Sequence, residues 1–533
     1  MDTLLCAAIP VDDAELALRN AHRAAEHGAD LVELRLDGFT DDAEAAIDLI
    51  RRCPLPVVLT VRPTWEGGDY DGDDTTRISF LERVCLDAPP AYLDIELETY
   101  QRSANLRQKI GLIVDHDAQP RPTGTGLILS SHDFEARPAD LDRRVLAMAD
   151  APACRVMKLA WRARSLRDNL EAFDLLHARH KPTIALCMGE AGLPSRVLAK
   201  KFGATLTFAA VDDEGGTAPG QPTLDQIKRL YRWDALGPDT AVFGVIGHPV
   251  GHSLSPAIHN AGFDAADFNG VYLPMPIPPE YEHFKATVLT WLEHPRLNFG
   301  GASVTIPHKA NLLRFVEEQR GEIEPLAAQI GAANTLVRRD DGSLYACNTD
   351  YAAAIDALCD VGGLDRSAVA DRRVAVLGAG GAARAVVAGL ADLGATVVVY
   401  NRTRAKADAL AAAFADAKGK VVAASMDKLC DSCCHAIVNC TPLGMHPHAD
   451  ASPIDPADAP WGRQRQGEAV VVFDTIYNPA KTKLLRDAAA AGCNTVSGVE
   501  MFVRQAVRQF ELWTQVEAPL DVFRGVVLEA LTG

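Results

Sequence analysis

Residues 1–211 repeat one pattern that leaves few folds open. A short apolar run rich in β-branched residues comes first, and a helical stretch rich in Ala, Leu and charged residues follows it. Strands that alternate with helices are typical of parallel α/β folds, and eight such units in about 230 residues predict a (β/α)8 barrel. The eight runs are 4–8, 31–36, 57–61, 92–97, 127–131, 155–160, 183–188 and 205–211.

A second α/β series follows the first. Before it lies a linker candidate, 231–241, which contains a Gly-Pro pair. A ninth apolar run in the first half, 110–114, is a candidate for an extra strand. The strands predicted in the second half are 242–247, 271–275, 301–306, 373–378, 396–400, 436–440 and 470–474.

The composition argues against several classes of function. The 533 residues carry 53 Lys and Arg against 71 Asp and Glu, a net charge of −18, and so acidic a surface argues against a nucleic-acid partner. We expect no membrane partner, because no apolar run is long enough to span a bilayer and the start lacks a secretory pattern. Twelve cysteines without regular spacing are typical of reduced thiols, so a cytoplasmic location is expected.

Lys158 is the most informative residue of the first half. It lies inside the sixth apolar run, between Met157 and Leu159. An inward lysine in apolar surroundings favours the neutral amine, which can attack a ketone and form a Schiff base. The alternative is a lysine that is ion-paired or that extends to solvent.

Other polar residues follow the predicted strands, where the active site of such a barrel lies. His132 follows the fifth strand and can move protons near neutral pH, and Glu66 could hold its imidazole in one tautomer. Arg35, Arg62 and Arg196 are candidate clamps for a carboxylate. Each of these residues also has a structural alternative, as a loop contact, a solvated acid or a surface ion pair.

Six segments of the first half occur in the order of one family: VELRLD (32–37), VRPTWEGG (61–68), SSHDF (130–134), VMKLA (156–160), LPSR (193–196) and APGQ (218–221). This half therefore resembles type I 3-dehydroquinate dehydratase, a metal-free Schiff-base enzyme on a (β/α)8 barrel. The resemblance implies that Lys158 forms the Schiff base, that His132 shuttles the proton and that Glu66 orients His132. It also implies that Arg196 holds the substrate carboxylate, and the remaining implied substrate-binding residues are Glu33, Arg35, Arg62, Thr217 and Gln221. Thr217 stands where many members have Ser, and it keeps the hydroxyl.

The second half contains a nucleotide-binding pattern. GAGGAA at 378–383 follows a predicted strand and opens an Ala-rich helical stretch. Such a turn predicts a dinucleotide site, because its glycines let a pyrophosphate approach the helix N-terminus; a simple glycine-rich turn is the alternative. The next strand ends in Asn401, Arg402 and Thr403 instead of an acid, so Arg402 could face a 2′-phosphate, which favours NADP. Arg402 and Lys406 could also be ordinary surface cations.

Further polar residues of the second half could bind a hydroxylated acid. Ser253 and Ser255 lie two residues apart, where a turn or a helix cap is the alternative. Lys309 follows SVTIPH and Asp350 ends CNTD. A lysine and an aspartate beside a hydride acceptor would form an acid–base pair.

Together with NCTPLGM (439–445), DTIYNP (474–479) and SGVEMFVRQA (497–506), these motifs resemble shikimate dehydrogenase across 242–533. The resemblance implies reduction of 3-dehydroshikimate to shikimate with NADPH, and it makes Lys309 and Asp350 the catalytic pair. The implied shikimate-binding residues are Ser253, Ser255, Thr305, Asn334, Asp350, Tyr477 and Gln505. The implied cofactor-binding residues are Gly378, Ala379, Gly380, Gly381, Ala382, Asn401, Arg402, Thr403, Lys406, Thr441, Gly498 and Met501.

The whole chain resembles the fused dehydratase–dehydrogenase proteins. Ser303 and Glu500 depart from the common bacterial dehydrogenase pattern, and both departures are similar to the fused family. The expected domains are a barrel at 1–232, a substrate domain at 241–348 completed by helices at about 503–533, and a Rossmann NADP domain at 349–502. The expected partners are small-molecule substrates, and the sequence does not set the oligomeric state.

Three alternatives stay open. The barrel could be an aldolase-like lyase, the second half could be a quinate dehydrogenase, or one half could bind metabolites without catalysis. A zinc site could also be suggested by Cys430, Cys433, Cys434 and His435. No second ligand pair follows at the spacing that structural zinc sites need, so no metal is expected.

Overall fold

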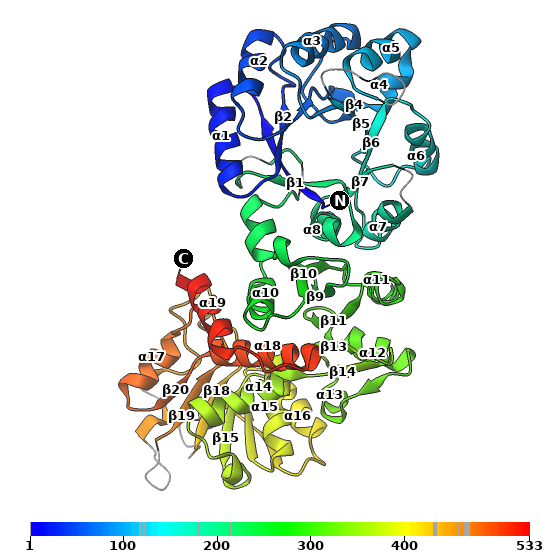
Figure 1. The fold of residues 1–533 in the computed structure, drawn as a ribbon. Coiled ribbons are helices and arrows are strands. Elements are labelled where there is room, and N and C mark those ends of the chain that lie inside the picture. The colour runs from blue at the N-terminus through cyan, green and yellow to red at the C-terminus, as the bar shows by residue number, and fades with distance from the viewer. Residues whose placement is uncertain are drawn as a thin grey trace. The chain divides into compact units, whose positions relative to one another are not determined.

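The computed structural model describes residues 2–116, 120, 124–178, 181–213, 216–218, 220–429, 434–456, 459–462 and 469–532 (Figure 1). The chain divides into two units. The first comprises 1–241 with 269–277 and 286–298, and the second comprises 242–268, 278–285 and 299–533. Among the described residues, none of the helices combines the length and the apolar character needed to cross a bilayer.

The first unit contains eight parallel strands in the order β7-β6-β5-β4-β3-β2-β1-β8. The two end strands also approach each other, because the Thr205 amide donates to the Thr183 carbonyl at 2.9 Å, so the sheet nearly closes into a barrel. The predicted (β/α)8 architecture is confirmed. The strands are β1 (Leu4–Pro10), β2 (Leu31–Arg35), β3 (Val57–Thr60), β4 (Tyr92–Glu96), β5 (Gly126–Asp133), β6 (Cys154–Arg162), β7 (Thr183–Met188) and β8 (Leu206–Ala210).

Helices follow the strands of the barrel. Several begin at a polar cap: the side chains of Asp13, Asp42, Asp73 and Ser103 each accept a hydrogen bond from an amide of the first turn. These caps explain where the helices start. The helices are α1 (Ala14–Glu26), α2 (Ala43–Arg52), α3 (Asp74–Asp87), α4 (Leu97–Arg102), α5 (Ala104–Ile113), α6 (Leu141–Ala149), α7 (Asp168–Ala178), α8 (Leu193–Val197) and α9 (Ala199–Phe202).

The ninth strand candidate of the first half, 110–114, is wrong. It forms the end of α5, in which Leu106, Ile110 and Ile113 are buried. That spacing of four and three residues places the three side chains on one face of a helix. A short apolar run has no periodicity of its own, and the upstream Leu106 and the Ser103 cap decide in favour of the helix.

The interior of the barrel has an apolar part and a polar part. Cys6, Val58, Ile128, Ile184 and Phe208 belong to one buried cluster, which gives the barrel a packed apolar core. The polar and charged side chains of the interior lie farther along the strands. Their positions are fixed by the parallel register, which pairs Glu96 with Ser130 and Ser130 with Lys158.

The second unit contains two sheets. In the first, five strands follow the order β9-β11-β13-β14-β12. Between residues 241 and 356, where β10 belongs to the first unit and α11 is divided between the two, the elements are β9 (Ala241–Gly247), α10 (Ser255–Ala265), β10 (Gly270–Pro276), α11 (Tyr281–Glu293), β11 (Phe299–Val304), α12 (Lys309–Glu318), β12 (Glu322–Ile323), α13 (Pro325–Ile330), β13 (Thr335–Arg338), β14 (Leu344–Cys347) and α14 (Thr349–Asp356).

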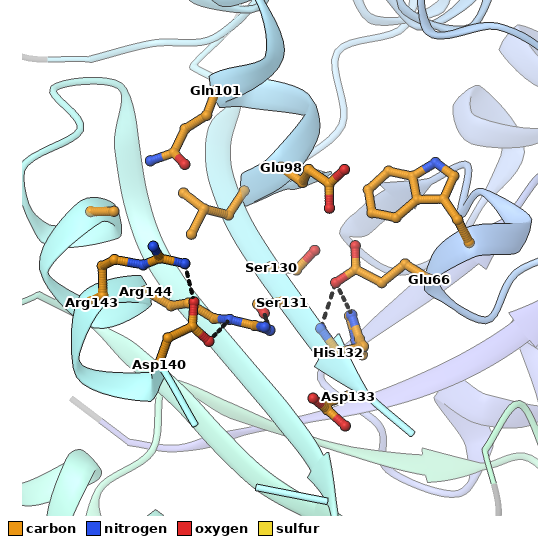
Figure 2. A pocket seen from close by; sticks show the side chains of 13 residues that line it. Glu66, Glu98, Gln101, Ser130, Ser131, His132, Asp133, Asp140, Arg143 and Arg144 are labelled. Carbon is orange, nitrogen blue, oxygen red and sulfur yellow. Dashed lines mark hydrogen bonds and ion pairs between the residues drawn. The ribbon is translucent and has the colours of Figure 1, made fainter. Parts of the chain in front are cut away.

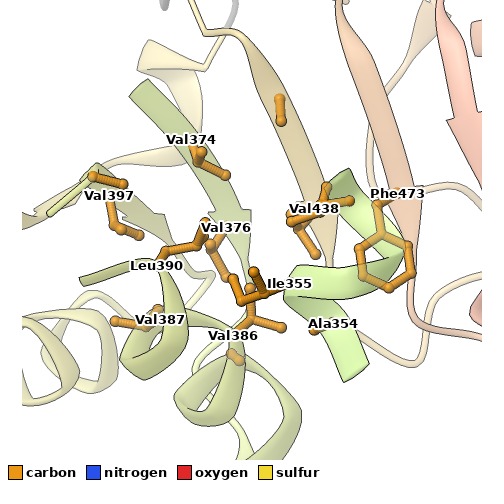
Figure 3. Packing of buried hydrophobic residues seen from close by; sticks show 14 of the residues in the cluster. Ala354, Ile355, Val374, Val376, Val386, Val387, Leu390, Val397, Val438 and Phe473 are labelled. Atoms are coloured by element: carbon orange, nitrogen blue, oxygen red, sulfur yellow. The ribbon is translucent and has the colours of Figure 1, made fainter. Parts of the chain in front are cut away.

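The other sheet has six strands, all paired in parallel, in the Rossmann order β17-β16-β15-β18-β19-β20. One face packs on α14 and α15, where Val376 and Val438 meet Ile355, Val386 and Leu390 (Figure 3). The elements are β15 (Arg373–Leu377), α15 (Gly381–Asp392), β16 (Thr396–Tyr400), α16 (Arg404–Ala413), β17 (Lys420–Ala424), β18 (Ala436–Asn439), β19 (Val471–Asp474), α17 (Lys483–Ala490), β20 (Asn494–Val496), α18 (Gly498–Thr514) and α19 (Leu520–Thr532).

The sequence pattern missed β12, β13, β14, β17 and β20, which have two to five residues each. Runs this short carry little periodicity, and their pairing partners decide their structure. The linker candidate 231–241 is less exposed than its Gly-Pro pair suggests, since Trp233 and Leu236 are buried. The predicted domain boundaries stay predictions.

Candidate active sites

The barrel holds one pocket that collects every residue predicted for the first-half site. It lies beside β2, β5, β6 and β8, where polar side chains of these strands and of the loops after them face the barrel interior. The predicted residues that line it are Glu33, Arg35, Arg62, Glu66, His132, Lys158, Arg196, Thr217 and Gln221, and Phe134, Leu186, Met188 and Phe208 add apolar surface. His132 lies within β5, one residue before its end, and not after it as the sequence pattern indicated.

The surroundings of Lys158 differ from the expectation. Its Nζ lies 2.8 Å from Asp94 Oδ2 and 3.3 Å from Glu33 Oε1, and the side chain is only 5% exposed. The Phe208 ring supplies the apolar contact, with its centroid 4.3 Å from Nζ. The prediction of an apolar setting is therefore wrong, and the ion-paired alternative holds: Asp94 on β4 and Glu33 on β2 each direct a carboxylate to the lysine on β6.

Lys158 ends a buried chain of alternating charges. Asp94 also binds Arg62 at 2.9 Å, and Arg62 binds Glu96 at 2.8 Å. Glu96 binds Arg77 at 2.7 Å, and the Arg77 side chain is fully buried. Since buried ions are tolerated only when they are paired and hydrogen-bonded, each member of this chain depends on its neighbours for its position.

The chain of charges fixes the protonation of its members. Burial alone would raise the pKa of Asp94, but Arg62 and Lys158 outweigh it and hold that pKa well below its ordinary value. Burial likewise opposes the charged form of Arg62, yet Asp94 and Glu96 raise the pKa of Arg62 above its ordinary value. Ser130 donates to Asp94 at 2.6 Å and accepts from Arg62 at 2.7 Å. The groups around Lys158 are thus rigid and charged.

Glu66 holds His132, as the sequence predicted. One Glu66 oxygen, Oε1, accepts from the His132 amide and lies 3.3 Å from the ring Nδ1. Burial raises the pKa of Glu66 to about 8. Burial, with Arg62 and Lys158 nearby, lowers the pKa of His132 well below its ordinary value, so its imidazole is neutral and can accept a proton.

Among the described residues, one of the three candidate arginine clamps has no carboxylate in its contacts. Arg35 pairs with Asp37, and Arg62 pairs with Asp94 and Glu96. Arg196 is 98% buried, and the described contact of its guanidinium is the Phe208 carbonyl at 3.4 Å. Burial lowers the pKa of Arg196 to about 10, which still leaves it charged at neutral pH. Arg196 is therefore best placed to bind an anionic ligand.

Thr217 and Gln221 lie together in the loop after β8. The amide and the hydroxyl of Thr217 donate to Gln221 Oε1 at 3.0 and 3.1 Å. Both residues line the pocket. The Thr217 hydroxyl thus orients Gln221.

The second unit has a pocket of its own, which collects the residues predicted for the second site. Its wall comes from β9, β11, α12, α14 and α18. The predicted residues that line it are Ser253, Ser255, Thr305, Lys309, Asn334, Asp350, Tyr477, Gly498, Met501 and Gln505, and His252, Thr475, Phe502 and Gln509 were not predicted.

Lys309 and Asp350 form the charged centre of this pocket. Lys309 Nζ lies 2.6 Å from Asp350 Oδ2, with side chains 32% and 19% exposed, so the pair stays accessible. Asn334 donates to the other Asp350 oxygen at 2.9 Å. Lys309 begins α12 and Asp350 lies in the first turn of α14, so two helix N-termini bring the pair together.

Two groups of side chains complete the wall. Ser253 Oγ accepts from the Ser255 amide at 3.3 Å, which is the turn that the sequence allowed as an alternative. The Tyr477 ring stacks on Phe502, with 4.8 Å between centroids. Gln505 donates within its own helix, to the Phe502 carbonyl. Both serine hydroxyls and the tyrosine still line the pocket.

Gln509 ties α18 to the sheet behind the pocket. It accepts from Ser303 at 2.7 Å, and its amide donates to Thr335 and to the Asn334 carbonyl. Ser303, which departs from the common bacterial pattern, thus contacts α18 through Gln509. The other departure, Glu500, pairs with Arg524 at 3.0 Å and so joins α18 to α19.

The glycine-rich turn lies between β15 and α15, as predicted. Gly378 has a φ of 109°, which only glycine adopts without strain. Gly380 caps α15 and Gly381 begins it, and a Cβ at either position would meet nothing within 4 Å among the described residues. Open space before a helix N-terminus suits a pyrophosphate. Ala379 and Ala382 belong to the same turn.

The residues predicted to surround a nucleotide ribose follow β16. Asn401 donates to the Thr403 carbonyl at 2.8 Å, and Arg402, Thr403 and Lys406 are exposed. No acid occupies the end of β16, in agreement with a 2′-phosphate instead of a bare ribose. Thr441 lies beside Gly378, whereas Gly498 and Met501 line the pocket of Lys309.

The cysteine-rich segment gives no sign of a metal site in its described part. Cys430 and Cys433 lie outside the described residues. His435 accepts at Nδ1 from the Arg373 amide at 3.0 Å. Within the described ranges, there are no groups of three or more potential metal ligands.

Sequence reasoning missed the buried charges behind Lys158. Asp94, Glu96 and Arg77 are the members that it did not name. Two acids two residues apart in the apolar run YLDIEL were the available signal, because such residues point to the same side of a strand. Arg77 gave no signal, since its helix brings it to Glu96 only in the folded barrel.

Comparison with known proteins covers both units. Four family models match: type I 3-dehydroquinase over 5–238, the shikimate dehydrogenase substrate binding domain over 245–336, shikimate/quinate 5-dehydrogenase over 364–441 and the shikimate 5′-dehydrogenase C-terminal domain over 498–528.

Similar proteins include one with both halves. The bifunctional 3-dehydroquinate dehydratase/shikimate dehydrogenase, chloroplastic, of Arabidopsis thaliana is 37% identical over 98% of this chain and 83% of its own length. The NADP(+) shikimate dehydrogenase of Methanocella arvoryzae is 43% identical over 54% of this chain and 99% of its own. The structure of shikimate 5-dehydrogenase from Thermus thermophilus, with NADP(H) and shikimate, is 31% identical over 55% of this chain and all of its own, with a TM-score of 0.47.

Proposed function

The chain belongs to the family of bifunctional 3-dehydroquinate dehydratase/shikimate dehydrogenases, and we propose that its two pockets are the sites of the two reactions. The barrel pocket dehydrates 3-dehydroquinate to 3-dehydroshikimate. The pocket around Lys309 and Asp350 reduces 3-dehydroshikimate to shikimate with NADPH. The product of the first site is thus the substrate of the second, and both substrates are small hydroxylated carboxylates.

Lys158 is the proposed nucleophile of the dehydratase. Its ammonium must first give up a proton, and Glu33, whose Oε1 lies 3.3 Å from Nζ, is the nearby acceptor. The amine then attacks the C3 ketone, and the ketone oxygen leaves as water. The resulting iminium draws electrons from C2 and so makes the C2 proton acidic. The paired charges around Lys158 stabilise the iminium, which is positive like the ammonium that it replaces.

His132 is the proposed base and acid of the elimination. Its neutral imidazole removes the C2 proton, and the imidazolium returns a proton to the C1 hydroxyl as it leaves. Glu66 fixes the ring through Nδ1, so Nε2 faces the substrate. Arg196 binds the substrate carboxylate, since it is the buried cation whose described contacts include no carboxylate.

Lys309 and Asp350 are the proposed catalytic pair of the dehydrogenase. The Lys309 ammonium donates a hydrogen bond to the substrate carbonyl oxygen and stabilises the alkoxide that develops on it. Asp350 holds Lys309 Nζ in position through the 2.6 Å ion pair and accepts a hydrogen bond from a substrate hydroxyl. Ser253 and Ser255 bind the substrate carboxylate through their hydroxyls.

The residues of the Rossmann sheet fit the NADP that this dehydrogenase uses. The open turn at Gly378, Gly380 and Gly381 would hold the pyrophosphate, and Arg402 with Lys406 would hold the 2′-phosphate. When bound, NADPH supplies the hydride for the carbonyl carbon. Met501 and Gly498 place apolar surface beside that carbon and exclude water from it.

The observation that carries the proposal is the convergence of Lys158, His132 and Arg196 in one barrel pocket. Its test is to mix the protein with 3-dehydroquinate and NADPH and to identify the product while NADPH oxidation is followed. Shikimate is the expected product. Quinate would show that the second site acts directly on 3-dehydroquinate, a C–C cleavage product would indicate an aldolase, and an absence of NADPH oxidation would overturn the two-site proposal.

Arg402 sets the cofactor preference. Arg402→Asp should raise the KM for NADPH by about tenfold to a hundredfold, since a charge-assisted hydrogen bond to phosphate contributes roughly 1.5–3 kcal/mol, and should leave the KM for NADH within a few-fold. Steady-state kinetics with both cofactors measures the change. Arg404→Asp is the matched control, because Arg404 is paired with Asp408. Equal losses in the two variants would contradict the assignment.

Arg77 positions the catalytic lysine through the chain of charges. Arg77→Met should lower the dehydratase kcat by about 10²-fold, because a small displacement of a catalytic group has an effect of that size. The dehydrogenase rate of the same chain should not change. Arg102→Met is the control. Asp74 binds Arg77 at 2.7 Å and Arg102 at 2.6 Å, but Arg102 lies at the surface. Thermal unfolding of both variants separates lost positioning from lost folding, and equal kcat values would rule the positioning role out.

The spacing of the cysteines led us to expect a cytoplasmic location. The Arabidopsis relative is described as chloroplastic, so a cytoplasmic location for this chain stays a prediction. Fractionation of cells that produce the chain would measure it directly.

A further inference from the structure

A second cavity adjoins the barrel pocket behind the His132–Glu66 pair (Figure 2). It lies among α4, β5 and α6, and only Glu66 and His132 line both cavities. Its volume is about 480 Å³, which is room for several water molecules. Gln101, Ser131 and Asp133 give it polar walls. Glu66 and His132, which act on protons in the proposed dehydratase, therefore lie between the barrel pocket and this polar cavity.

One oxygen of Glu66 is buried at the edge of this region and has no partner among the described residues. Oε1 binds His132, whereas Oε2 is buried and has no hydrogen-bond partner among the described residues. In Figure 2 the unbonded oxygen of Glu66 lies on the side of Glu98, which lines the same cavity. A buried carboxyl oxygen is normally hydrogen-bonded, so a water in the cavity suits Oε2.

The dehydratase cycle needs such a place for water. Formation of the imine joins Lys158 Nζ to C3 and releases the ketone oxygen as water. Elimination breaks the C2–H and C1–O bonds and releases a second water. Hydrolysis then adds one water to C3 and breaks the C–N bond, which returns the amine. Each turnover thus moves two waters out of the barrel pocket and one into it.

We propose that the cavity behind His132 and Glu66 is the water site of the dehydratase, where Glu66 Oε2 binds a water and through which the water of the cycle is exchanged. The proposal rests on the proposed function of the barrel pocket. Since burial keeps Glu66 protonated near neutral pH, its carboxyl can donate to this water or accept from it. The polar lining lets water exchange with solvent while the substrate remains bound.

The test fills the cavity from its outer wall. Ala147 on α6 lines the cavity, and Ala147→Phe places a ring where the water would lie. Ala149→Phe, on the same helix but absent from the cavity lining, is the matched control. The measured quantities are kcat, the KM for 3-dehydroquinate, and the fraction of chain trapped by borohydride as a Lys158 adduct during turnover. The dehydrogenase rate of the same chain reports the amount of active protein.

The expected result for Ala147→Phe is a kcat about tenfold lower, which corresponds to 1.36 kcal/mol, with an unchanged KM. The trapped fraction should rise, because the product imine waits for its water. Ala147→Met should give a smaller effect in the same direction if the larger ring disturbs folding. A kcat and trapped fraction equal to those of Ala149→Phe would overturn the proposal, and so would a higher KM at unchanged kcat, which would indicate a substrate subsite. If wild-type protein forms no adduct at all, the proposed function itself fails.

Discussion

Lys158→Met should abolish the conversion of 3-dehydroquinate and leave the reduction of 3-dehydroshikimate by NADPH unchanged. Loss of the nucleophile removes the covalent path, so the dehydratase kcat should fall by roughly 10⁴-fold or more. The residual rate is measured from the absorbance of the conjugated product. Wild-type protein treated with borohydride and 3-dehydroquinate should gain the mass of a reduced imine on the peptide that contains Lys158.

This variant also removes a buried cation from between Asp94 and Glu33. Breaking a buried ion pair costs about 3–5 kcal/mol, so instability of the barrel could imitate lost catalysis. Lys158→Arg keeps the positive charge but forms no imine, and it should be equally inactive with a smaller loss of thermal stability. Activity within tenfold of wild type in either variant, or an adduct on another lysine, would refute the assignment.

The second large effect is expected at Lys309. Lys309→Met removes the donor to the developing alkoxide and the partner of Asp350, 2.6 Å away. A single positioned acid–base group contributes about 10²–10⁴-fold, so the dehydrogenase kcat should fall by that factor. The Kd for NADPH should stay within a few-fold, because the glycine-rich turn lies on another sheet. Steady-state kinetics and cofactor fluorescence measure the two quantities.

A surface lysine of the same half provides the control. Lys285 pairs with Glu318 at 2.8 Å and lies outside the pocket, so Lys285→Met should keep the wild-type rate. A mixture of Lys158→Met and Lys309→Met proteins should again convert 3-dehydroquinate to shikimate, since each retains one active half. A Lys309→Met variant that matches Lys285→Met in kcat would exclude the catalytic role.

Residues that a motif fixes locally were predictable. The alternation of strands and helices predicted the eight strands of the barrel and four of the six Rossmann strands, because a buried parallel strand leaves an apolar run between two helical patterns. Gly378, Gly380 and Gly381 were predictable for the same reason, since the turn between a strand and a helix needs them in sequence. The placement of Lys158, His132 and Glu66 in one pocket agrees with the motif order.

The contacts between side chains on different strands could not be predicted from the sequence. The resemblance named Arg35, Arg62 and Arg196 without distinguishing their partners, and only the barrel shows that Asp37, Asp94 and Glu96 engage two of them. The apolar setting expected for Lys158 was wrong for the same reason, because its flanking residues in sequence point away from the barrel interior that it faces. Asp94 on β4 and Glu33 on β2 reach it from strands that do not pair with its own strand, β6.

The sequence by itself determined the two α/β architectures, the family and the residues able to do the chemistry, because these depend on local periodicity and on motifs of a few residues. The tertiary structure alone decided which of these residues meet. In the folded barrel Lys158 is ion-paired, and Arg35 and Arg62 bind carboxylates. The guanidinium of Arg196 contacts the Phe208 carbonyl, and a polar cavity adjoins Glu66. The physical reason is that charges in a barrel interior interact across strands over a few ångströms, and the parallel register that sets those distances joins residues far apart in the chain.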